Sequence, residues 1–580
     1  MRTQRTFRWL LTSLLLLAIV LPSHRGQAAG DNPLVAAAKD DDLQAVRALI
    51  ARRANVNELS RDGSTALLWA VFHSNLEMAR ALIAAGAAVN TPNHYALTPL
   101  LQASRSGDAP LIAALLKAGA DPAVPRPDSE TPLMAASRTG RMDAVRLLIE
   151  AGADVNAADT YQLETALMWA AGEGHVDVVK TLLKAGADPN RKAHVNALEE
   201  RKHADHPTGG FTALMFAVRN GHEDVARALI KGGADLSLTN GDGATAMIIA
   251  VVNDRFDFAS TLLDLGADPK DGSLYFAVDM HDATTDMRAH DGSRLRATHP
   301  NKLTALDLVR LLLDRGADPN KPFVGQLHST TLCCGAEINA SPFYRAAVAS
   351  DVEVLKLMIA RGAQIEWSPS EVKKEGRGGG GGGRGMNANV GKTPIMVAMT
   401  GGRGAAFAAG PGFDRPGPPP FREASNRAPI DALTVLLAAG ANPNTKAPDG
   451  ATPLHQAVQA QQVAIIRALV AAGAKFDATN KDNLTPLQLA EKPETDGRGN
   501  AGMMMDPNAY RPKRDTREEV VAVLRELMGL GANDPTPVPP PLPAEPDKKV
   551  DDKKTNEKKA DETKKGDAAA GRVESQRVAR

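Results

Sequence analysis

The sequence predicts an all-α solenoid of about twelve helix–turn–helix units, with β-turn fingers that join one unit to the next. Two observations lead to this fold class. A phrase of threonine, then proline or alanine, then leucine recurs along the chain, and its first four copies stand 33, 33 and 34 residues apart. Aromatic residues make up only 4% of the chain, so alanine, leucine and valine must form the core, which suits small helices that stack closely.

Two anchor residues recur in fixed phase along the repeats. Threonine is a good N-cap because its hydroxyl accepts a hydrogen bond from an amide that would otherwise lack a partner, and proline is favoured directly after it. Glycine at the far end takes the left-handed conformation that ends the second helix. The threonines are Thr65, Thr98, Thr131, Thr165, Thr212, Thr245, Thr393, Thr452 and Thr485. The matching glycines are Gly86, Gly119, Gly152, Gly186, Gly233, Gly266, Gly316, Gly362, Gly440, Gly473 and Gly531.

These anchors resemble the ankyrin repeat, and the chain as a whole resembles the exported bacterial type of ankyrin-repeat protein. The segment Thr452–Ala457 reads Thr-Pro-Leu-His-Gln-Ala, which matches the signature of that repeat. Leu182–Asp188 gives the usual end of its second helix. The resemblance extends from about Pro33 to Gly531 and implies a stack of helix pairs whose concave side binds another protein. It also implies that His175 and His222, which each follow a glycine, make structural hydrogen bonds.

The first thirty residues predict a targeting segment. Three arginines within the first eight residues precede an apolar run from Trp9 to Leu21, and small residues surround Ala28. We therefore predict a signal peptide at residues 1–28 that is cleaved after Ala28. The alternative is an uncleaved membrane anchor, but the apolar run of about 13 residues falls short of the roughly 20 that a spanning helix needs. The mature chain is thus predicted to be periplasmic or secreted, with no stable membrane span.

The rest of the chain divides into three parts. Regular repeats occupy residues 31–270, and repeats interrupted by insertions occupy residues 271–531. The insertions fall in the fingers or between paired helices, where a solenoid tolerates extra chain. Residues 532–580 are rich in proline and then in lysine, aspartate and glutamate, which is a composition too polar to form a core. We predict that this tail is disordered.

Composition and motifs argue against several function classes. The 68 basic residues balance the 68 acidic ones, and we find no nucleic-acid-binding motif, so no nucleic-acid partner is predicted. No serine-histidine-aspartate order, no pair of carboxylates in a plausible cleft and no cofactor fingerprint is present. We therefore predict no catalytic residues and no cofactor.

Two alternatives to a binding scaffold remain. In a metal- or redox-linked accessory protein, His281, His290 and His299 with nearby aspartates could hold a metal, and Cys333 with Cys334 could form a redox pair. The histidine spacing matches no ligand pattern, so we predict a solvated loop and no metal site. A secreted effector that acts on another cell is the third hypothesis, which rests on export alone.

The resemblance places the binding surface on the fingers and on the ends of the first helices. Tyrosine and arginine are enriched in binding hot spots, whereas the plainer interpretation is that exposed arginines only solvate the stack. The predicted function is that of a monomeric, non-enzymatic scaffold for a protein partner of unknown identity. The candidate binding residues are Phe72, His73, Arg105, Arg138 and Arg219 near the ends of the first helices, with Tyr95, Tyr161 and Phe211 in the fingers.

Overall fold

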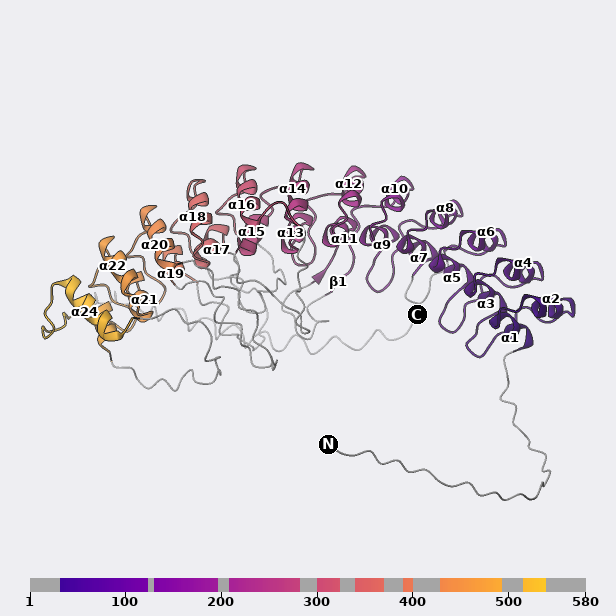
Figure 1. The fold of residues 1–580 in the computed structure, drawn as a ribbon, viewed down its shortest axis with the longest axis horizontal. Coiled ribbons are helices and arrows are strands. Elements are labelled where there is room, and N and C mark those ends of the chain that lie inside the picture. Colours follow the sequence, from indigo (N-terminus) through magenta and orange to yellow (C-terminus); the bar gives the residue numbers. More distant parts are fainter. Residues whose placement is uncertain are drawn as a thin grey trace, which may run out of the picture.

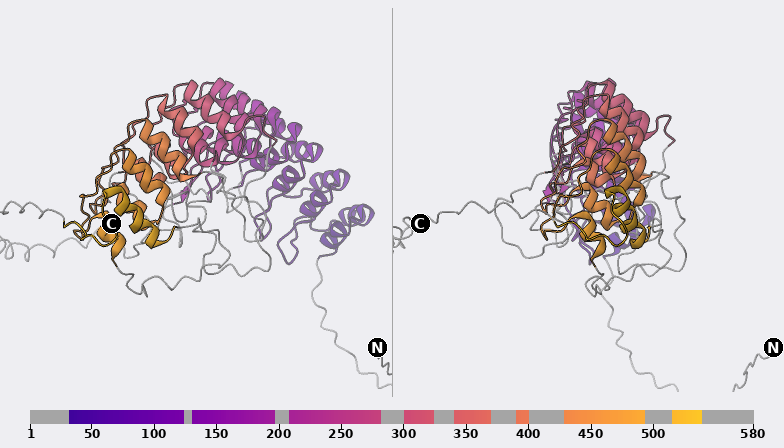
Figure 2. Two further views of the ribbon diagram at one scale, coloured as in Figure 1. Left: turned by 60° about the vertical axis from the view of Figure 1, so that its left-hand side comes forward. Right: turned by 90° about the vertical axis from the view of Figure 1, so that its left-hand side faces the viewer.

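The helices of the protein stack in pairs to form an arch, with one row of helices on its inner side and one on its outer side (Figure 1). In views turned about the vertical axis, the pairs follow one another in two layers (Figure 2). This arrangement confirms the predicted fold class, a helical repeat solenoid. The computed structural model describes residues 32–123, 130–196, 208–281, 300–323, 340–369, 390–399, 428–492 and 515–538.

Each pair has an inner helix followed by an outer helix. The inner helices are α1 (Pro33–Lys39), α3 (Ala66–Phe72), α5 (Pro99–Ser106), α7 (Pro132–Thr139), α9 (Ala166–Gly172), α11 (Ala213–Asn220), α13 (Ala246–Val252), α15 (Ser273–His281), α17 (Pro342–Val348), α19 (Pro394–Ala398), α21 (Pro453–Gln459) and α23 (Pro486–Glu491). The outer helices are α2 (Leu43–Ala51), α4 (Leu76–Ala84), α6 (Ala109–Lys117), α8 (Met142–Glu150), α10 (Val176–Lys184), α12 (Glu223–Lys231), α14 (Phe256–Asp264), α16 (Ala305–Asp314), α18 (Val352–Ile359), α20 (Pro429–Ala438), α22 (Val463–Ala471) and α24 (Arg517–Met528).

Most anchor residues act at the helix ends as the sequence predicts, but two do not. Helix α24 ends at Gly529 (φ 70°) and not at Gly531, and Thr393 precedes α19 without a side-chain cap bond. The hydroxyl of Thr65 accepts a hydrogen bond from the Leu68 amide (3.1 Å), and α3 begins directly after this threonine. Gly86 follows the outer helix α4 with a φ of 91°, a left-handed conformation in which most other residues are strained. The inner helices are buried through small and branched side chains such as Leu67 and Ala70. These small side chains allow the inner helices to stack closely on one another.

Asparagine side chains link successive units at the turns that follow the outer helices. The Asn57 side-chain amide donates to the Gly86 carbonyl (3.1 Å), and its oxygen accepts from the Ala88 amide (2.6 Å). The same pair of bonds is made by Asn90, Asn156, Asn190, Asn320 and Asn444. Ala123 occupies this place in the third unit and has no polar side-chain atom to make either bond.

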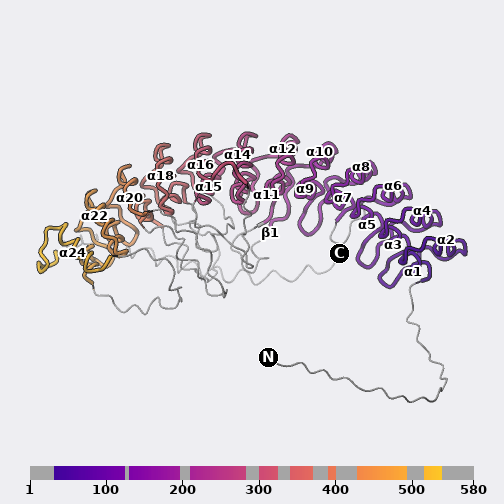
Figure 3. The backbone as a smooth tube through the Cα atoms, viewed as in Figure 1, coloured from indigo at the N-terminus to yellow at the C-terminus, as the bar shows by residue number. Residues whose placement is uncertain are grey.

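The fingers lie on the inner side of the arch, between successive pairs (Figure 3). A two-residue ribbon extends one of them, with β1 (Val195–Asn196) antiparallel to β2 (Thr208–Gly209). Backbone bonds join this ribbon to the fingers on both sides, from the His194 amide to the Gln162 carbonyl (2.6 Å) and from the Gly241 amide to the Gly209 carbonyl (2.8 Å). Neighbouring fingers therefore support one another.

The segment after α24 is held against the last inner helix. Arg525 donates to the carbonyl of Asp534 (2.9 Å), and the Thr536 hydroxyl donates to Glu491 of α23 (2.6 Å). Within the described part of the chain, no helix is long and apolar enough to cross a membrane. The predicted signal peptide at residues 1–28 lies outside the described residues, as does the tail beyond Val538.

Candidate partner-binding surface

The seventh residue after each N-cap lies at or next to the end of an inner helix. In the first six units this position forms a row that we call the inner row. Most of its members are basic, so positive charge follows the inner side of the first half of the arch. The inner row consists of Lys39, Phe72, Arg105, Arg138, Gly172 and Arg219.

The exposed large apolar side chains of the first half lie at one position of this row and in the fingers. Phe72 is 59% exposed at the end of α3, and Tyr95 and Tyr161 are 68% and 77% exposed in two fingers. Leu59, Leu163 and Val195 are the other exposed members of this group in the first half. Apart from Val538 near the end of the described chain, the described residues contain no further exposed large apolar side chain.

The first cluster on the surface is built around Trp69 of α3. The Lys39 ammonium lies 5.4 Å from the centre of its ring, and Phe72 meets it edge-on with ring centres 5.6 Å apart. His73 lies within hydrogen-bonding distance of the Lys39 carbonyl through its Nε2 atom (2.9 Å), so this predicted binding residue also links the first two units. Phe72 thus stands on a rigid base while its own ring faces solvent.

The second cluster joins three units through one carboxylate. Glu130, in the finger before α7, forms an ion pair with Arg105 of α5 and lies 3.9 Å from the nearest guanidinium nitrogen of Arg138. Arg138 in turn lies over the ring of Trp169 in α9, 5.4 Å from its centre. Two guanidinium groups share the Glu130 carboxylate, which leaves this cluster with an excess of positive charge.

The third cluster lies at α11 and the finger before it. The Arg219 guanidinium is 5.3 Å from the ring centre of Phe211 and 5.1 Å from that of Phe216, and the two rings are 5.4 Å apart. Burial lowers the pKa of Arg219, and the nearby Glu164 carboxylate opposes that shift. Burial raises the pKa of Glu164, with a further contribution from Asp159.

The second half of the arch carries a buried ion pair and a histidine–aspartate contact instead. Asp279 of α15 and Arg345 of α17 are 2.7 Å apart, and both side chains are nearly buried. His281, the last residue of α15, pairs with the buried Asp351 at 2.6 Å. Asp351 is also the N-cap of α18. These four side chains hold neighbouring units together and offer little free charge to a partner.

Comparison with known proteins decides the family. The family model for ankyrin repeats (three copies) matches residues 8–93, 100–193, 195–272 and 422–495, which together are more than half of the chain. The chain belongs to the ankyrin-repeat family. Ankyrin repeats are generally protein–protein interaction modules, and proteins of this family are typically binding scaffolds without enzymatic activity.

Solved ankyrin domains are similar to parts of the chain. The ankyrin repeat domain of human ASB11 is 27% identical, and the match covers 41% of this chain and 98% of that one with a TM-score of 0.35. The ankyrin repeat domain of Bcl-3, described as a unique member of the IkappaB protein family, is 27% identical over 38% of this chain and 94% of that one, with a TM-score of 0.33. No curated protein matches the chain.

The ankyrin geometry distributes the predicted binding residues rather than gathering them at one point. Phe72, His73, Arg105, Arg138, Phe211 and Arg219 fall into the three clusters, while Tyr95 and Tyr161 lie exposed in separate fingers. The structural roles of two histidines are confirmed. The Nε2 atom of His175 lies 3.0 Å from the Arg138 carbonyl, and that of His222 lies 3.0 Å from the Gly172 carbonyl.

Sequence reasoning overlooked some of the surface. Lys39, Leu59, Leu163 and Val195 were not among the predicted residues, yet Lys39 belongs to the first cluster and the other three are exposed in fingers. Lys39 could have been found because it stands seven residues after Asn32, which caps α1 although it is not a threonine. Leu59, Leu163 and Val195 stand in fingers, where a large apolar side chain has no core to enter.

The metal and redox alternatives find no support in the described residues. That part of the chain contains no group of three or more histidine, cysteine, aspartate or glutamate side chains placed to hold a metal. His281 is engaged with Asp351. His290, His299, Cys333 and Cys334 lie outside the described residues.

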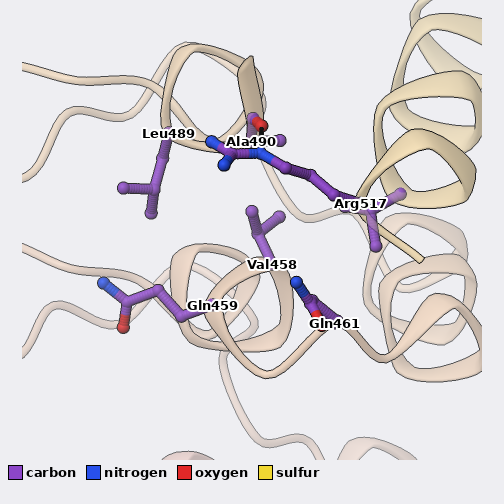
Figure 4. Close-up of a pocket in the computed structure, with 7 residues that line it drawn as sticks. Val458, Gln459, Gln461, Leu489, Ala490 and Arg517 are labelled. Atoms are coloured by element: carbon purple, nitrogen blue, oxygen red, sulfur yellow. Dashed lines mark hydrogen bonds between the residues drawn. The ribbon is translucent and has the colours of Figure 1, made fainter. Parts of the chain in front are cut away.

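A small cavity lies at the far end of the ankyrin stack, between α21, α23 and the start of α24 (Figure 4). It has a volume of about 140 Å³. Its one charged side chain, Arg517, reaches across to the Ala490 carbonyl and donates to it. The remaining lining residues are Val458, Gln459, Gln461, Leu489, Ala490 and Val520. This lining does not combine the acid, base and nucleophile that catalysis requires.

Proposed function

We propose that the chain is an exported, monomeric and non-enzymatic scaffold that acts in the periplasm or outside the cell. It binds a protein partner on the inner side of the first six repeats. The observation that carries this proposal is that, Val538 apart, the exposed large apolar side chains of the described residues all lie in the fingers and at one inner-row position of the first half. Exposed apolar groups rimmed by polar ones are typical of protein interaction sites.

The chemistry of these side chains fits a binding role better than a role in folding. Phe72, Tyr95 and Tyr161 leave most of their surface in water, so they contribute little to the core. Aromatic side chains bury a large area when a partner covers them and lose little rotamer freedom. Because the helix stack already orders its inner surface, binding there requires little reorganisation of the scaffold.

A capture experiment tests the proposed surface. The variant Phe72→Ala, Tyr95→Ala, Tyr161→Ala removes three exposed rings and leaves the half-buried Glu130 paired with its arginines. The matched control Arg80→Ala, Arg146→Ala, Lys180→Ala changes three exposed residues of the outer helices. Proteins that crosslink to the wild-type chain and to the control in a periplasmic extract should be lost with the aromatic variant. If all three chains capture the same set, the surface is assigned wrongly.

Export is supported by the arginines, apolar run and small residues of positions 1–28. Expression of the full chain followed by fractionation and mass spectrometry tests it. We expect a periplasmic or extracellular protein whose first residue is Ala29. An intact Met1 on a chain that stays in the cytoplasm would remove export from the proposal. Light scattering of the mature chain tests its monomeric state.

A further inference from the structure

Among the described residues, Arg219 is a basic side chain of the inner row that has no carboxylate within ion-pair distance. Arg105 and Arg138 both have Glu130, whereas Arg219 makes one long hydrogen bond, from Nε to Asn220 (3.4 Å). Its two terminal nitrogens donate to no described residue. The rings of Phe211 and Phe216 nevertheless hold the guanidinium in one place. Arg219 is therefore accessible, fixed in orientation and short of an anion.

The inner row has a gap beside this arginine. Gly172 is the row's member in the preceding unit, and it is helical, so its backbone conformation does not require glycine. A Cβ atom at this position would find its nearest neighbours at 3.8 Å (Asn220 Nδ2) and 3.9 Å (Phe216 Cβ), which is ordinary contact. A glycine within a helix is less favourable for stability than an alanine at the same position. The missing side chain leaves open surface next to Phe216 and Asn220.

We propose that Arg219 and the gap at Gly172 form an anchor for a carboxylate side chain of an extended peptide segment in the partner, flanked by apolar residues that contact the exposed rings. This inference rests on the proposed function and names the chemistry of the partner. The planar guanidinium can present two parallel N–H groups to a carboxylate. Because two rings already fix it, little side-chain entropy is lost on binding.

Charge complementarity favours an acidic segment over a basic one. The inner row of the first six units carries Lys39, Arg105, Arg138 and Arg219. Its neighbouring acids are Glu130, which is engaged by two arginines, Glu173, which is exposed next to Gly172, and Glu164. Glu164 interacts electrostatically with Arg219 but forms no ion pair with it at contact distance among the described residues, so an incoming carboxylate can take the closer position. Basic partners would meet the row's arginines and be repelled.

Selection of peptides on the full-length protein tests the anchor. A library of random twelve-residue peptides is displayed on phage, selected on the wild-type chain and sequenced. We expect enriched peptides with at least one acidic residue flanked by aromatic or aliphatic residues. The best peptide is then synthesised with a fluorophore, and its affinity is measured by anisotropy.

Three single variants give the expected pattern. Arg219→Gln keeps a planar polar group on the rings but removes the charge, and should weaken binding about tenfold or more. Glu164→Gln removes the nearby competing carboxylate and should strengthen binding up to about threefold. Gly172→Leu fills the gap and should weaken binding about tenfold. Gln459→Leu, at the same position of α21, is the matched control and should leave affinity unchanged.

The outcomes separate this inference from the proposed function. If the triple variant Phe72→Ala, Tyr95→Ala, Tyr161→Ala loses peptide binding but Arg219→Gln keeps the wild-type affinity, the proposed anchor is wrong and the proposed binding surface stands. If the selected peptides are basic, or if a labelled single-stranded oligonucleotide binds in an Arg219-dependent way, the carboxylate chemistry is wrong. If no selected peptide depends on any inner-side residue, both proposals fail.

Discussion

The two halves of the arch use the same two positions for different chemistry. In the first half, Arg138 stands seven residues after the N-cap of α7. It lies over Trp169, which stands four residues after the N-cap of the next inner helix, α9. In the second half, Asp279 and Arg345 occupy the corresponding positions of α15 and α17 and form an ion pair. The Arg138 side chain is 42% exposed, whereas those of Arg345 and Asp279 are 13% and 10% exposed.

This difference shows how one repeat framework can serve either binding or cohesion. A cation on an aromatic face keeps its N–H groups available, so a partner can use them. A buried ion pair has both charges satisfied, and neither is available to a partner without a large cost. The first half is thus suited to recognition and the second to holding units together.

The largest expected effect comes from breaking the pair in the second half. Arg345→Met leaves the buried Asp279 carboxylate without its guanidinium and should lower the free energy of unfolding by about 3–5 kcal/mol. Arg138→Met removes an exposed contact and should cost about 1 kcal/mol or less. Urea unfolding can be followed with Trp367, which packs on Tyr344 (5.5 Å), as the single tryptophan.

The control for this prediction is the double variant Asp279→Asn, Arg345→Met. It removes both charges and should recover part of the lost stability, because no unpaired charge stays buried. For Arg138→Met, Trp69 serves as the single reporter in the first half. Equal losses from Arg345→Met and Arg138→Met would contradict the distinction between the two halves.

A smaller effect is expected from the asparagine links, which are incomplete even in the regular first half. The Ala123 amide donates to the Asp121 side chain (2.8 Å), just as the Asn156 amide donates to the Asp154 side chain (2.8 Å). The two turns therefore have the same local hydrogen bond, so Ala123→Asn should fit the backbone and add the two side-chain bonds to the next unit. Each is worth about 0.5–1.5 kcal/mol when well formed. We expect a gain of about 1 kcal/mol in urea unfolding of the first half.

Two further variants test whether the gain from Ala123→Asn comes from the asparagine link between units. Asn156→Ala removes both bonds and should cost about 1–2 kcal/mol. An aspartate side chain at position 123 can accept a hydrogen bond from the next unit's amide but cannot donate one to its carbonyl. Ala123→Asp should therefore raise the free energy of unfolding less than Ala123→Asn does. Destabilisation by Ala123→Asn would mean that the turn of the third unit is not equivalent to the others.

The first half could be predicted from sequence because its contacts follow the repeat phase. A threonine and a glycine, such as Thr65 and Gly86, mark the two ends of a helix pair, and the inner row is found by counting from the N-caps. The pair of His281 and Asp351 could not be found this way, since 70 residues and two insertions separate them. Glu130 stands in a finger, and only the structure shows that it lies between two arginines.

Acid should destabilise the second half through a residue that the first half lacks. Burial lowers the pKa of His455 in α21, and the neutral ring accepts from the Thr452 amide at Nδ1 (3.2 Å) while Nε2 meets the Leu484 carbonyl (2.9 Å). A proton on Nδ1 would face the Thr452 N–H. In the unfolded chain, histidine takes up its proton at about pH 6.5. The contribution of His455 is therefore present above about pH 6.5 and lost as pH falls toward the lower folded pKa.

The variant His455→Met tests this titration. Met134 holds the same position in α7, where its sulfur accepts from the Thr131 amide (3.4 Å), so methionine suits the site and does not titrate. Urea unfolding of the second half at pH 7.5 and pH 5.0 should show a smaller loss of stability in the variant than in the wild type. A loss of the same size in both would assign the pH dependence to other groups.

The smallest expected effect on stability is at the exposed rings, and it bears most directly on function. Tyr161 is 77% exposed in its finger, where the turn is held by Asp159, which accepts from the Tyr161 amide (2.9 Å). Tyr161→Ser keeps that amide and should change the free energy of unfolding by no more than about 0.5 kcal/mol. A ring that the fold does not need, in a row of such rings, is best explained by what it contacts in a complex. If Tyr161→Ser instead destabilised the first half by as much as Asn156→Ala, the ring would belong to the finger's own packing, and the case for a binding surface would rest on Phe72 and Tyr95.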